Sequence, residues 1–406
     1  MIVGCIIGYV LLINRDDDTN QSSWSKELQV KLSILGEWLH APEGTPPPPL
    51  NAESAQNPEK RLLILIWKWG PLLNRRHVRH PDKKEQANGP GIRRPPFPSE
   101  GCSVKTCDLT YRDEDLATAD AVVFHLHRTK GAHELPSAKG KPGQIWIFLT
   151  DESPLHTFVW PDGNRELSQY DGKFDWSMSY RDNSDIPVPY GRTIERKNSD
   201  DNERLRVLEK RRKKLAAVVI SDCGSNEHRS DYVKELKSLL GKNLDIIRSC
   251  FGGNNTACPG YCWKDCPLLS AYKFYLAFEN SECREYITEK TYWNAYGKGS
   301  VPVILGVPRA DCERLLPPRS FIYTADFQSP SKLADYLRYL DNNDDAYDEY
   351  HAWRSEYVVL NEHGYFGSRS VHYCRICEAL RYNIRPAQPP EYHRLSHFLN
   401  ATRDCY

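Results

Sequence analysis

The segment YKFYLAFENSECREYITEKTYWNAYGKGSVPVILG, from Tyr272 to Gly306, contains the pattern that decides the fold class. Its two apolar runs, YKFYLAFE and SVPVILG, are short and bounded by turn-forming residues, which is typical of strands that are covered on both faces of a parallel sheet. The stretch EYITEKTYWNAYGKG between them is expected to form a helix. This order of strand, helix and strand predicts one unit of a doubly wound α/β sheet, in which ligands bind beyond the carboxyl ends of the strands.

A polar group lies where such a sheet would bind a ligand. Thr288, Glu289 and Lys290 are expected in the first turns of the helix, near its free N–H groups and the positive end of its dipole. Lys290 suits a phosphate or diphosphate, and Glu289 suits the paired hydroxyls of a sugar. From these residues alone, an exposed Glu and Lys on an amphipathic helix is the favoured alternative.

The same alternation of apolar runs and amphipathic stretches extends in both directions. RLLILIWKWG, AVVFHL and IWIFL are predicted strands of a first α/β domain, whereas LAAVVIS, EHRSDYVKELKSLL, LDII and SPSKLADYLRYLDN are predicted strands and helices of a second. The predicted organisation is an apolar segment over residues 1–13, a Pro-rich stem over 14–60, a first domain over 61–195, a charged connector over 196–214, a Rossmann-like second domain over 215–390 and a tail over 391–406.

Composition and processing signals favour the lumen of the secretory pathway. The 406 residues carry a formal net charge of +0, so the charge balance does not indicate a nucleic-acid partner. Twelve of the 13 cysteines follow residue 100, an even number that suits up to six disulfides. Asn20, Asn254 and Asn400 begin Asn-x-Ser/Thr glycosylation patterns.

The N-terminal apolar run, from Met1 to Ile13, would span about 20 Å as a helix, against about 30 Å for the hydrocarbon core of a bilayer. It lacks a preceding positive flank and a following small-residue cleavage site. Two interpretations stay open: an uncleaved type II signal anchor whose start lies upstream, or a fragment of a signal peptide. The missing cleavage site favours the anchor.

The opening segment resembles the donor-binding signature of the α1,3-fucosyltransferases, whose typical form reads FENS, then DYITEK, then N-A, then G-x-VPV-x-G. YRDNSDIPVPYG is similar to the family's YRRDSDI-x-VPYG segment, and IWIFLTDESPLHT is similar to its W-ESP-H segment. FQSPSKLADYLRYLDNNDDAY and CRICEAL also match. The resemblance runs in order from about Arg61 to Leu380, and it displaces the interpretation of an ordinary exposed helix.

The resemblance implies a GT-B fold, in which an N-terminal acceptor domain and a C-terminal donor domain, both Rossmann-like, face an inter-domain cleft. It implies inverting transfer of L-fucose from GDP-β-L-fucose to the 3-hydroxyl of N-acetylglucosamine, with no required cofactor. Asp182 stands where the family has a second Arg, so one basic contact near the donor has no match here. The positions that match donor contacts are Arg229, Asn280, Tyr286, Glu289 and Lys290, with Tyr180 and Arg181 as weaker candidates.

Inversion also requires a carboxylate that takes the proton of the acceptor hydroxyl. Glu152, in DESPLH, matches the Glu of the family's ESP motif and is predicted to be this base. Asp151 is its neighbour and the alternative carboxylate. Both follow the third apolar run of the first domain, so the base is expected to come from that domain and the donor contacts from the other.

The cysteines and the acceptor are interpreted through the same resemblance. It implies that Cys102 and Cys107 pair with Cys374 and Cys377, and that Cys223 pairs with Cys283; the six remaining cysteines allow 15 connectivities. The insert CFGGNNTACPGYCWKDCP resembles a segment of the invertebrate and plant enzymes that fucosylate the N-glycan core, although its spacing differs.

The resulting expectation is a Golgi type II membrane glycoprotein with a lumenal catalytic body, which fucosylates core or antennary N-acetylglucosamine of N-glycans. Two alternatives stay open. The acceptor could be a protein hydroxyl, or the chain could be a silent glycan-binding protein that retains the fold.

Metal ligation is the weaker interpretation of the remaining motifs. Asp113 to Asp115 have the D-x-D form of metal-dependent glycosyltransferases, but they are expected to begin a helix, where acidic residues complement the dipole. His125 and His127 are expected on one face of a strand, as a core or hydrogen-bonded pair rather than as ligands. Zinc at the clustered cysteines is less favoured than disulfides. No metal site is predicted, and an effect of divalent metal on the rate stays open.

Overall fold

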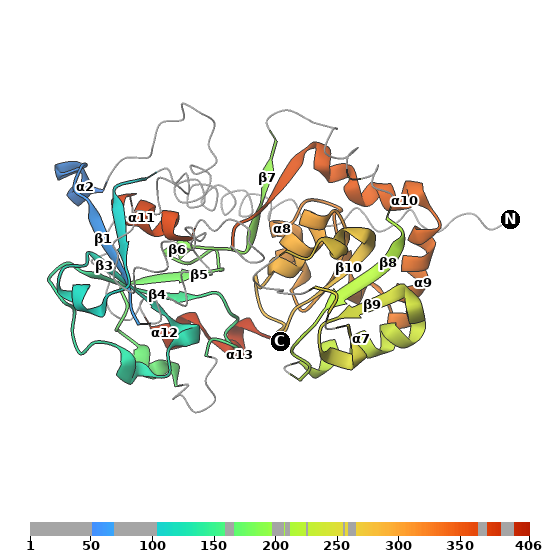
Figure 1. Ribbon diagram of the computed structural model, residues 1–406, viewed down its shortest axis with the longest axis horizontal. Coiled ribbons are helices and arrows are strands. Elements are labelled where there is room, and N and C mark those ends of the chain that lie inside the picture. Colours follow the sequence, from blue (N-terminus) through green and yellow to red (C-terminus); the bar gives the residue numbers. More distant parts are fainter. Residues whose placement is uncertain are drawn as a thin grey trace, which may run out of the picture. The chain divides into compact units, whose positions relative to one another are not determined.

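The computed structural model describes residues 51–68, 104–158, 166–196, 207, 212–224, 226–254, 256–258, 265–363, 372–382 and 394–406 (Figure 1). The predicted membrane segment and Asn20 lie outside these ranges. Within them, no helix has the length and apolar character that a membrane span requires. The predicted α/β class is confirmed, because the described strands form two parallel sheets and a separate two-stranded ribbon.

The first sheet has six strands in the order β2-β1-β3-β4-β5-β6, and every neighbouring pair is parallel. All residues of its three central apolar strands are buried, as the continuous apolar runs predicted. The strands are β1 (Leu62–Ile66), β2 (Cys107–Thr110), β3 (Ala121–His125), β4 (Ile145–Thr150), β5 (Trp176–Ser179) and β6 (Ile186–Pro187).

The second sheet is also parallel and has the order β12-β11-β10-β8-β9, with the predicted strand YKFYLAF at its centre. All seven residues of that strand are buried. The strands are β8 (Lys214–Val219), β9 (Leu244–Ile247), β10 (Tyr272–Phe278), β11 (Val301–Leu305) and β12 (Ile322–Tyr323). The helices that follow them include α7 (Glu227–Leu240), α8 (Arg309–Leu315), α9 (Pro330–Asp341) and α10 (Asp344–Asp348).

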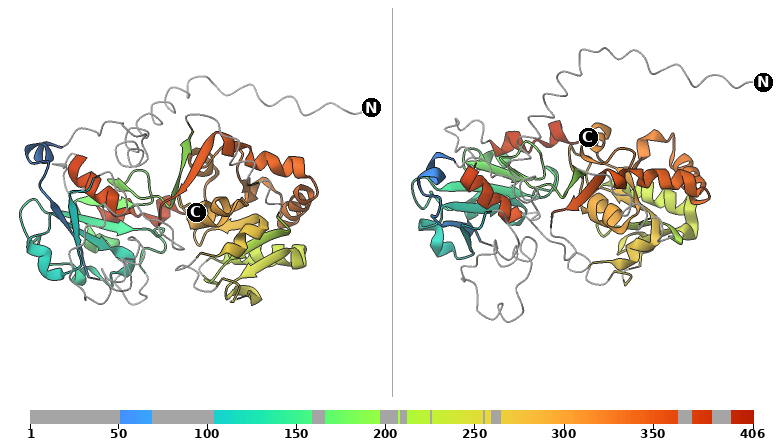
Figure 2. Two further views of the ribbon diagram at one scale, coloured as in Figure 1. Left: turned by 45° about the horizontal axis from the view of Figure 1, so that its top comes forward. Right: turned by 90° about the horizontal axis from the view of Figure 1, so that it is seen from above.

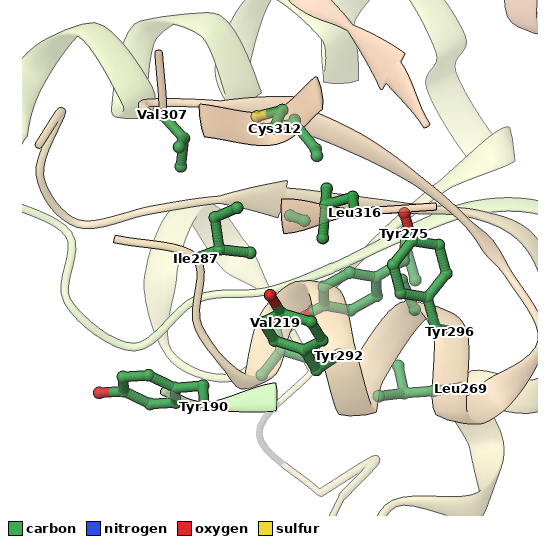
Figure 3. Packing of buried hydrophobic residues seen from close by; sticks show 14 of the residues in the cluster. Tyr190, Val219, Leu269, Tyr275, Ile287, Tyr292, Tyr296, Val307, Cys312 and Leu316 are labelled. Carbon is green, nitrogen blue, oxygen red and sulfur yellow. The ribbon is translucent and has the colours of Figure 1, made fainter. Parts of the chain in front are cut away.

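Alternate residues of β10 face two different cores. Phe274 and Leu276 pack with the apolar stripes of α7 and α9, such as Leu236 and Leu337. Tyr275 and Ala277 point to the opposite face, because successive strand residues alternate between faces. That face is covered by the segment after β10 and by α8, through Ile287, Tyr292, Tyr296, Cys312 and Leu316 (Figure 3).

The helix predicted over the segment EYITEKTYWNAYGKG begins later than expected. A π-helix spans Lys290–Ala295 and a 3₁₀ helix spans Tyr296–Lys298, so Thr288 and Glu289 precede the helix. The carboxylate of Glu279 accepts hydrogen bonds from the N–H and the hydroxyl of Thr288, each at 2.9 Å, just before the helix begins. Glu285 adopts a left-handed conformation, with φ of 58°, which a helix excludes.

The sequence patterns do not indicate the two-stranded antiparallel ribbon of β7 (Gly191–Glu195) and β13 (Tyr357–Asn361), which pairs Gly191 with Asn361. The chain leaves the first sheet through β7 and leaves the second through β13. At Gly191, a Cβ atom would collide with the carbonyl oxygen of Leu360 and the ring of Tyr292. Only glycine therefore lets the ribbon lie against the helix Lys290–Ala295.

After the ribbon, the chain returns to the first sheet. The helix α11 (His372–Tyr382) lies beside the strands of that sheet (Figure 2), and the disulfide Cys107–Cys377 links it to β2. The short helices α12 (Leu395–Phe398) and α13 (Ala401–Asp404) follow. Leu395 and Leu399 are buried in the same apolar cluster as Leu65 of β1. Residues far apart in the chain thus complete one core.

The disulfides confirm one predicted linkage and correct another. Cys107–Cys377 is as expected, and Cys374 is also disulfide-bonded, whereas Cys102 lies outside the described residues. The expected pairing of Cys223 with Cys283 is wrong. Cys223 and Cys250 follow the neighbouring parallel strands β8 and β9, which brings them together, and Cys283 is bonded to the chain's penultimate residue. The observed bridges are Cys107–Cys377, Cys223–Cys250, Cys258–Cys266 and Cys283–Cys405.

The free thiol of Cys312 corrects the expectation that all cysteines after residue 100 could pair. It lies on the buried face of α8, and burial raises the pKa of its thiol. Cys262 lies outside the described residues. Cys312 therefore behaves as a small apolar core residue.

Candidate active site

The two carboxylates after β4 have different surroundings. Asp151 is fully buried, and its carboxylate oxygens lie 3.2 Å from Nε2 of His125 and 3.3 Å from Nε2 of His363. Glu152 is partly exposed and accepts a 2.8 Å hydrogen bond from the Tyr286 hydroxyl. Glu152 thus contacts the segment predicted to bind the donor, so the structure favours it over Asp151 as the candidate base.

The histidines beside β4 are held by hydrogen bonds, as expected, but not on one face of a strand. β3 ends at His125, and His127 lies on a 3₁₀ turn that spans Leu126–Arg128. The ring of His127 donates from Nδ1 to the carbonyl of His156 at 3.1 Å. The turn after β3 therefore supports the loop that carries Glu152.

Two loops that the sequence places more than 120 residues apart are joined by three hydrogen bonds. Tyr286 bonds to Glu152, the Ser281 hydroxyl donates to the Ser153 hydroxyl at 2.6 Å, and Nε2 of His156 donates to the carbonyl of Asn280 at 3.3 Å. The DESPLH loop after β4 thus contacts the FENS loop after β10. Both loops lie at the carboxyl ends of parallel strands, where α/β sheets bind ligands.

Lys290 has a partner that the sequence did not reveal. Its Nζ lies 2.8 Å from a carboxylate oxygen of Glu279 and 3.6 Å from one of Glu289. Burial raises the pKa of Glu279, whereas the carboxylates of Glu279 and Glu289 overcome burial and raise the pKa of Lys290. Glu279 is the acid of FENS itself. The only sequence signal for its role was its position at the end of a buried strand.

Arg229 brings a second cation to this group from α7. The side chain of Asn226 caps the helix by accepting from the N–H of Arg229 at 2.9 Å, and the guanidinium donates to the carbonyl of Asp222 at 2.6 Å. Burial lowers the pKa of Arg229, and the charges of Asp222 and Glu279 partly oppose this. Arg229 also lowers the pKa of Lys290, so the two cations are close enough to interact. Such a pair suits a diphosphate.

Tyr180 and Tyr286 form an aromatic contact beside the candidate base Glu152. Their ring centroids are 5.1 Å apart, and both rings are buried. Burial and the charge of Glu152 raise the pKa of Tyr286 well above its usual value. Tyr286 therefore stays protonated, and its hydroxyl donates a hydrogen bond to Glu152.

Arg181 does not join this group, so its expected donor contact is not supported. It is 2% exposed and donates to the carboxylate of Asp404 at 2.9 Å and to the carbonyl of Phe398 at 2.7 Å. Its neighbour Asp182 accepts from Arg314 of α8 at 2.7 Å. The carboxylate of Asp182 thus pairs with the guanidinium of Arg314, which lies on helix α8 of the second domain.

The two Asp side chains of the D-x-D motif accept hydrogen bonds from nearby residues of the first domain. The motif begins a 3₁₀ helix that spans Asp113–Ala117, in agreement with the expected helical start. Asp113 accepts from the N–H of Lys68 at 3.0 Å, and Asp115 accepts from the Thr110 hydroxyl at 2.6 Å. In the part of the chain that the structure describes, no cluster of three or more His, Cys, Asp or Glu side chains is arranged to hold a metal ion.

Comparison with known families covers both halves of the chain. Residues 59–191 match the family described as "Fucosyltransferase, N-terminal", and residues 209–397 match "Glycosyltransferase family 10 (fucosyltransferase) C-term". The first match ends where the ribbon strand β7 begins, and the second starts at residue 209. They contain the two contacting loops of the candidate site, one in each matched range.

Individual relatives agree with the family. The chain is 35% identical over 331 residues to Alpha-(1,3)-fucosyltransferase 7 of Bos taurus, covering 80% of this chain and 82% of the relative. The human protein of that name is 34% identical over 351 residues, covering 84% and 85%. The human 4-galactosyl-N-acetylglucosaminide 3-alpha-L-fucosyltransferase FUT6 is 36% identical over 286 residues, covering 69% and 73%.

A crystal structure of an α1,3-fucosyltransferase with GDP-fucose is 16% identical and covers 88% of this chain and 97% of its own, with a TM-score of 0.47. The family matches and the relatives at 34 to 36% identity decide the assignment. The chain, with its two parallel α/β sheets of the GT-B class, therefore belongs to the α1,3-fucosyltransferases of glycosyltransferase family 10 and is a fucosyltransferase enzyme.

Proposed function

We propose that this enzyme transfers L-fucose from GDP-β-L-fucose, with inversion, in α1,3 linkage to N-acetylglucosamine of glycoprotein N-glycans. The observation that carries the proposal is the hydrogen bond from Tyr286 to Glu152, because it joins the candidate base to the donor motif. A binding protein has no need of a base at this place.

In this mechanism, Glu152 accepts the proton of the acceptor hydroxyl while the bond from its oxygen to fucose C1 forms. The bond from C1 to the diphosphate oxygen breaks on the opposite face, and GDP leaves with the electron pair. Arg229 and Lys290 stabilise the negative charge that develops on the leaving diphosphate. Glu289 and Asn280 are the proposed partners of donor hydroxyl groups.

The tyrosine has a positioning role in this scheme. Because the pKa of Tyr286 is raised by burial and by Glu152, Tyr286 keeps its proton and donates a hydrogen bond to the carboxylate of Glu152. The hydrogen bond orients one carboxylate oxygen and leaves the other for the acceptor. We infer no required metal cofactor, and an effect of divalent metal on the rate is left to experiment.

The acceptor proposal rests on the relatives. The name of human FUT6 states that it acts on 4-galactosyl-N-acetylglucosaminide, and it is 36% identical to this chain. This favours an antennary N-acetylglucosamine that carries galactose over the core residue. The core remains the alternative suggested by the Cys-rich insert, part of which is closed by the disulfide Cys258–Cys266.

We further propose that the chain is a single-pass type II protein of the Golgi membrane with its catalytic part in the lumen. The apolar run at its start and the disulfides of the described residues support this proposal. Expression of the tagged full chain in animal cells, followed by protease protection of sealed Golgi vesicles, tests the topology. Cleavage of the catalytic part in intact vesicles would contradict it.

The enzymatic proposal is tested with the purified chain, labelled GDP-fucose and a panel of acceptors. The panel contains a galactosylated biantennary glycopeptide, the same glycopeptide without galactose, a chitobiose core glycopeptide and an unglycosylated peptide. We expect transfer to the galactosylated glycopeptide and a linkage at O3 of N-acetylglucosamine, determined by NMR. Transfer to the peptide alone would replace the N-glycan proposal with protein fucosylation.

A further inference from the structure

Residues 394–406 form a segment that is held in place at both of its ends, and we name this segment the C-terminal strap. Its first part is anchored on the first sheet. Leu395 and Leu399 are fully buried in the apolar cluster of that sheet. The N–H and hydroxyl of Ser396 both donate to the carboxylate of Asp171, at 2.9 and 2.6 Å.

The other end of the strap is fastened to the donor motif. Cys405 forms a disulfide with Cys283, and the two residues also form an antiparallel β-bridge. The N–H of Arg284 donates to the carbonyl of Asp404, and the N–H of Tyr406 donates to the carbonyl of Glu282, both at 2.8 Å. The strap thus pairs with residues 282–284, in the middle of the motif.

A buried charge cluster lies where the strap meets the motif. The Asp404 carboxylate is buried and lies 2.9 Å from Nη1 of Arg181, 2.6 Å from Nη2 of Arg403 and 3.9 Å from Nη1 of Arg284. Arg181 also donates to the carbonyl of Phe398 within the strap. Asp404 therefore connects a cation of the first sheet's YRDNSDI segment with the loop that follows β10.

The loop to which the strap is fastened, residues 280–286, depends on contacts with other parts of the chain for its conformation. Residues 280–286 are not helical, and Glu285 adopts a left-handed conformation that is unfavourable for a residue with a Cβ atom. The same loop supplies Asn280, Ser281 and Tyr286, which make the hydrogen bonds to the DESPLH loop. Its geometry is therefore set by contacts with distant residues, and the strap provides several of these.

We propose that the C-terminal strap positions the donor motif against Glu152, with Asp404 and Cys405 as positioning residues for donor binding. The inference rests on the proposed function of that motif. Neither residue contacts the donor in this scheme; they act through residues 282–284. A displacement of residues 282–284 would shift Asn280, a proposed partner of donor hydroxyl groups in the same loop, and would thus weaken donor binding.

The test compares two variants in the full chain: Asp404→Asn, which removes the charge but keeps the size, and the double variant Cys283→Ser/Cys405→Ser, which removes the covalent link. We expect kcat/KM for GDP-fucose to fall about tenfold or more in each, mainly through a higher donor KM. The acceptor KM should stay within about twofold. Asp404→Glu, which keeps the charge, should recover part of the donor affinity.

Matched controls separate positioning from a general loss of structure. Asp108→Asn removes another Asp–Arg pair of the first sheet, in which Arg61 lies 2.6 Å from Asp108, and Cys258→Ser/Cys266→Ser removes another disulfide. Partial unfolding lowers the active fraction and thus kcat, but it leaves the donor KM unchanged. An unchanged donor KM in both strap variants, with only kcat and Tm lowered, would overturn the proposal.

Calorimetric titration with GDP alone keeps this test independent of the acceptor. We expect the Kd for GDP to rise about tenfold in the strap variants and to stay unchanged in the controls. If no acceptor in the panel is fucosylated, the proposed acceptor class fails, whereas weaker GDP binding in the strap variants still supports the strap. Equal GDP affinity in all variants overturns it whatever the acceptor.

Discussion

Tyr286 donates a 2.8 Å hydrogen bond to Glu152, a residue 134 positions earlier in the chain. The bond joins the loop after β4 of the first sheet to the loop after β10 of the second. It places a carboxylate of intermediate exposure beside a buried phenol that stays protonated. The candidate base is therefore oriented by the same loop that is proposed to bind the donor.

The variant Glu152→Gln should retain the shape of the side chain and lose the base. We expect turnover to fall by at least about a hundredfold, because general-base catalysis typically contributes this much. GDP affinity, measured by calorimetry, should change little. Asp151→Asn is an unsuitable control because Asp151 lies between two buried histidines. Turnover at the wild-type level would exclude Glu152 as the base.

Tyr286→Phe should test the orientation of that base separately. The ring keeps its contact with Tyr180, and only the hydrogen bond to Glu152 is removed. A hydrogen bond to a charged group contributes about 1.5 to 3 kcal/mol, so we expect kcat to fall roughly tenfold to a hundredfold. Because burial and Glu152 raise the Tyr286 pKa well above 10, the phenol stays protonated and the ratio of the two enzymes should be constant from about pH 7.5 to 9. A ratio that varies across this range would contradict the proposed protonation state.

Variants of Lys290 and Glu279 should separate the contribution of Lys290 to stability from its contribution to donor binding. Lys290→Met leaves the buried carboxylate of Glu279 without its ion-pair partner at 2.8 Å. Removing one partner of a buried pair costs about 3–5 kcal/mol of unfolding free energy. The double variant Lys290→Met/Glu279→Gln should recover much of this stability in denaturant titrations, but not GDP affinity. Recovery of both properties would assign Lys290 a structural role alone.

Asp404 should contribute to stability in a defined pH range. Burial opposes ionisation, but the guanidinium groups of Arg403 and Arg181 lower the pKa of Asp404 below its usual value. A carboxylate with a lowered folded-state pKa binds fewer protons when folded, so its contribution is present above the unfolded pKa of about 3.9 and lost as the pH falls below it. The difference in Tm between wild type and Asp404→Asn should thus be larger at about pH 6 than at about pH 3. An equal difference at both values would contradict this linkage.

Asn254 should carry a glycan when the chain is made in animal cells. It is exposed, and its side-chain oxygen accepts hydrogen bonds from the N–H and hydroxyl of Thr256, at 2.9 and 2.8 Å. Asn254→Gln and Thr256→Ala should each remove one glycan mass, detected by mass spectrometry before and after endoglycosidase. The matched variant Asn400→Gln tests a site whose side chain caps α13. Unchanged mass in both Asn254 and Thr256 variants would show that the site is unused.

Local patterns in the sequence predicted α7 and the long apolar strands of both sheets, but not the strands β2, β5, β6 and β12. The predicted helix EHRSDYVKELKSLL coincides with α7, because its apolar stripe and its Asn cap are local signals. The strand at Tyr272–Phe278 was predicted equally well from its apolar run, and all its residues are buried in the structure. Glu152, Arg229, Asn280, Tyr286 and Lys290 were assigned by family resemblance, and the structure brings them into contacting loops or within electrostatic range.

The features that the sequence did not reveal depend on distant partners. The carboxylate of Glu279 binds Thr288 just before the helix that follows β10, and no periodicity indicates such a contact. Arg181 matches a family motif, but its partner Asp404 lies in a segment that resembled a plain tail. The pairing of Cys283 with Cys405 depends on the path of the whole chain. Local propensity carries no information about any of these partners.

The return of the chain to the first sheet has a consequence for its biosynthesis. Leu395 and Leu399 complete the core that begins at β1, and the disulfide Cys107–Cys377 joins positions 270 residues apart. A ribosome must therefore reach Leu399 before the first sheet, which begins with β1, can finish folding. During that time the nascent chain exposes apolar strands and unpaired thiols, so its maturation depends on chaperones and on thiol oxidoreductases.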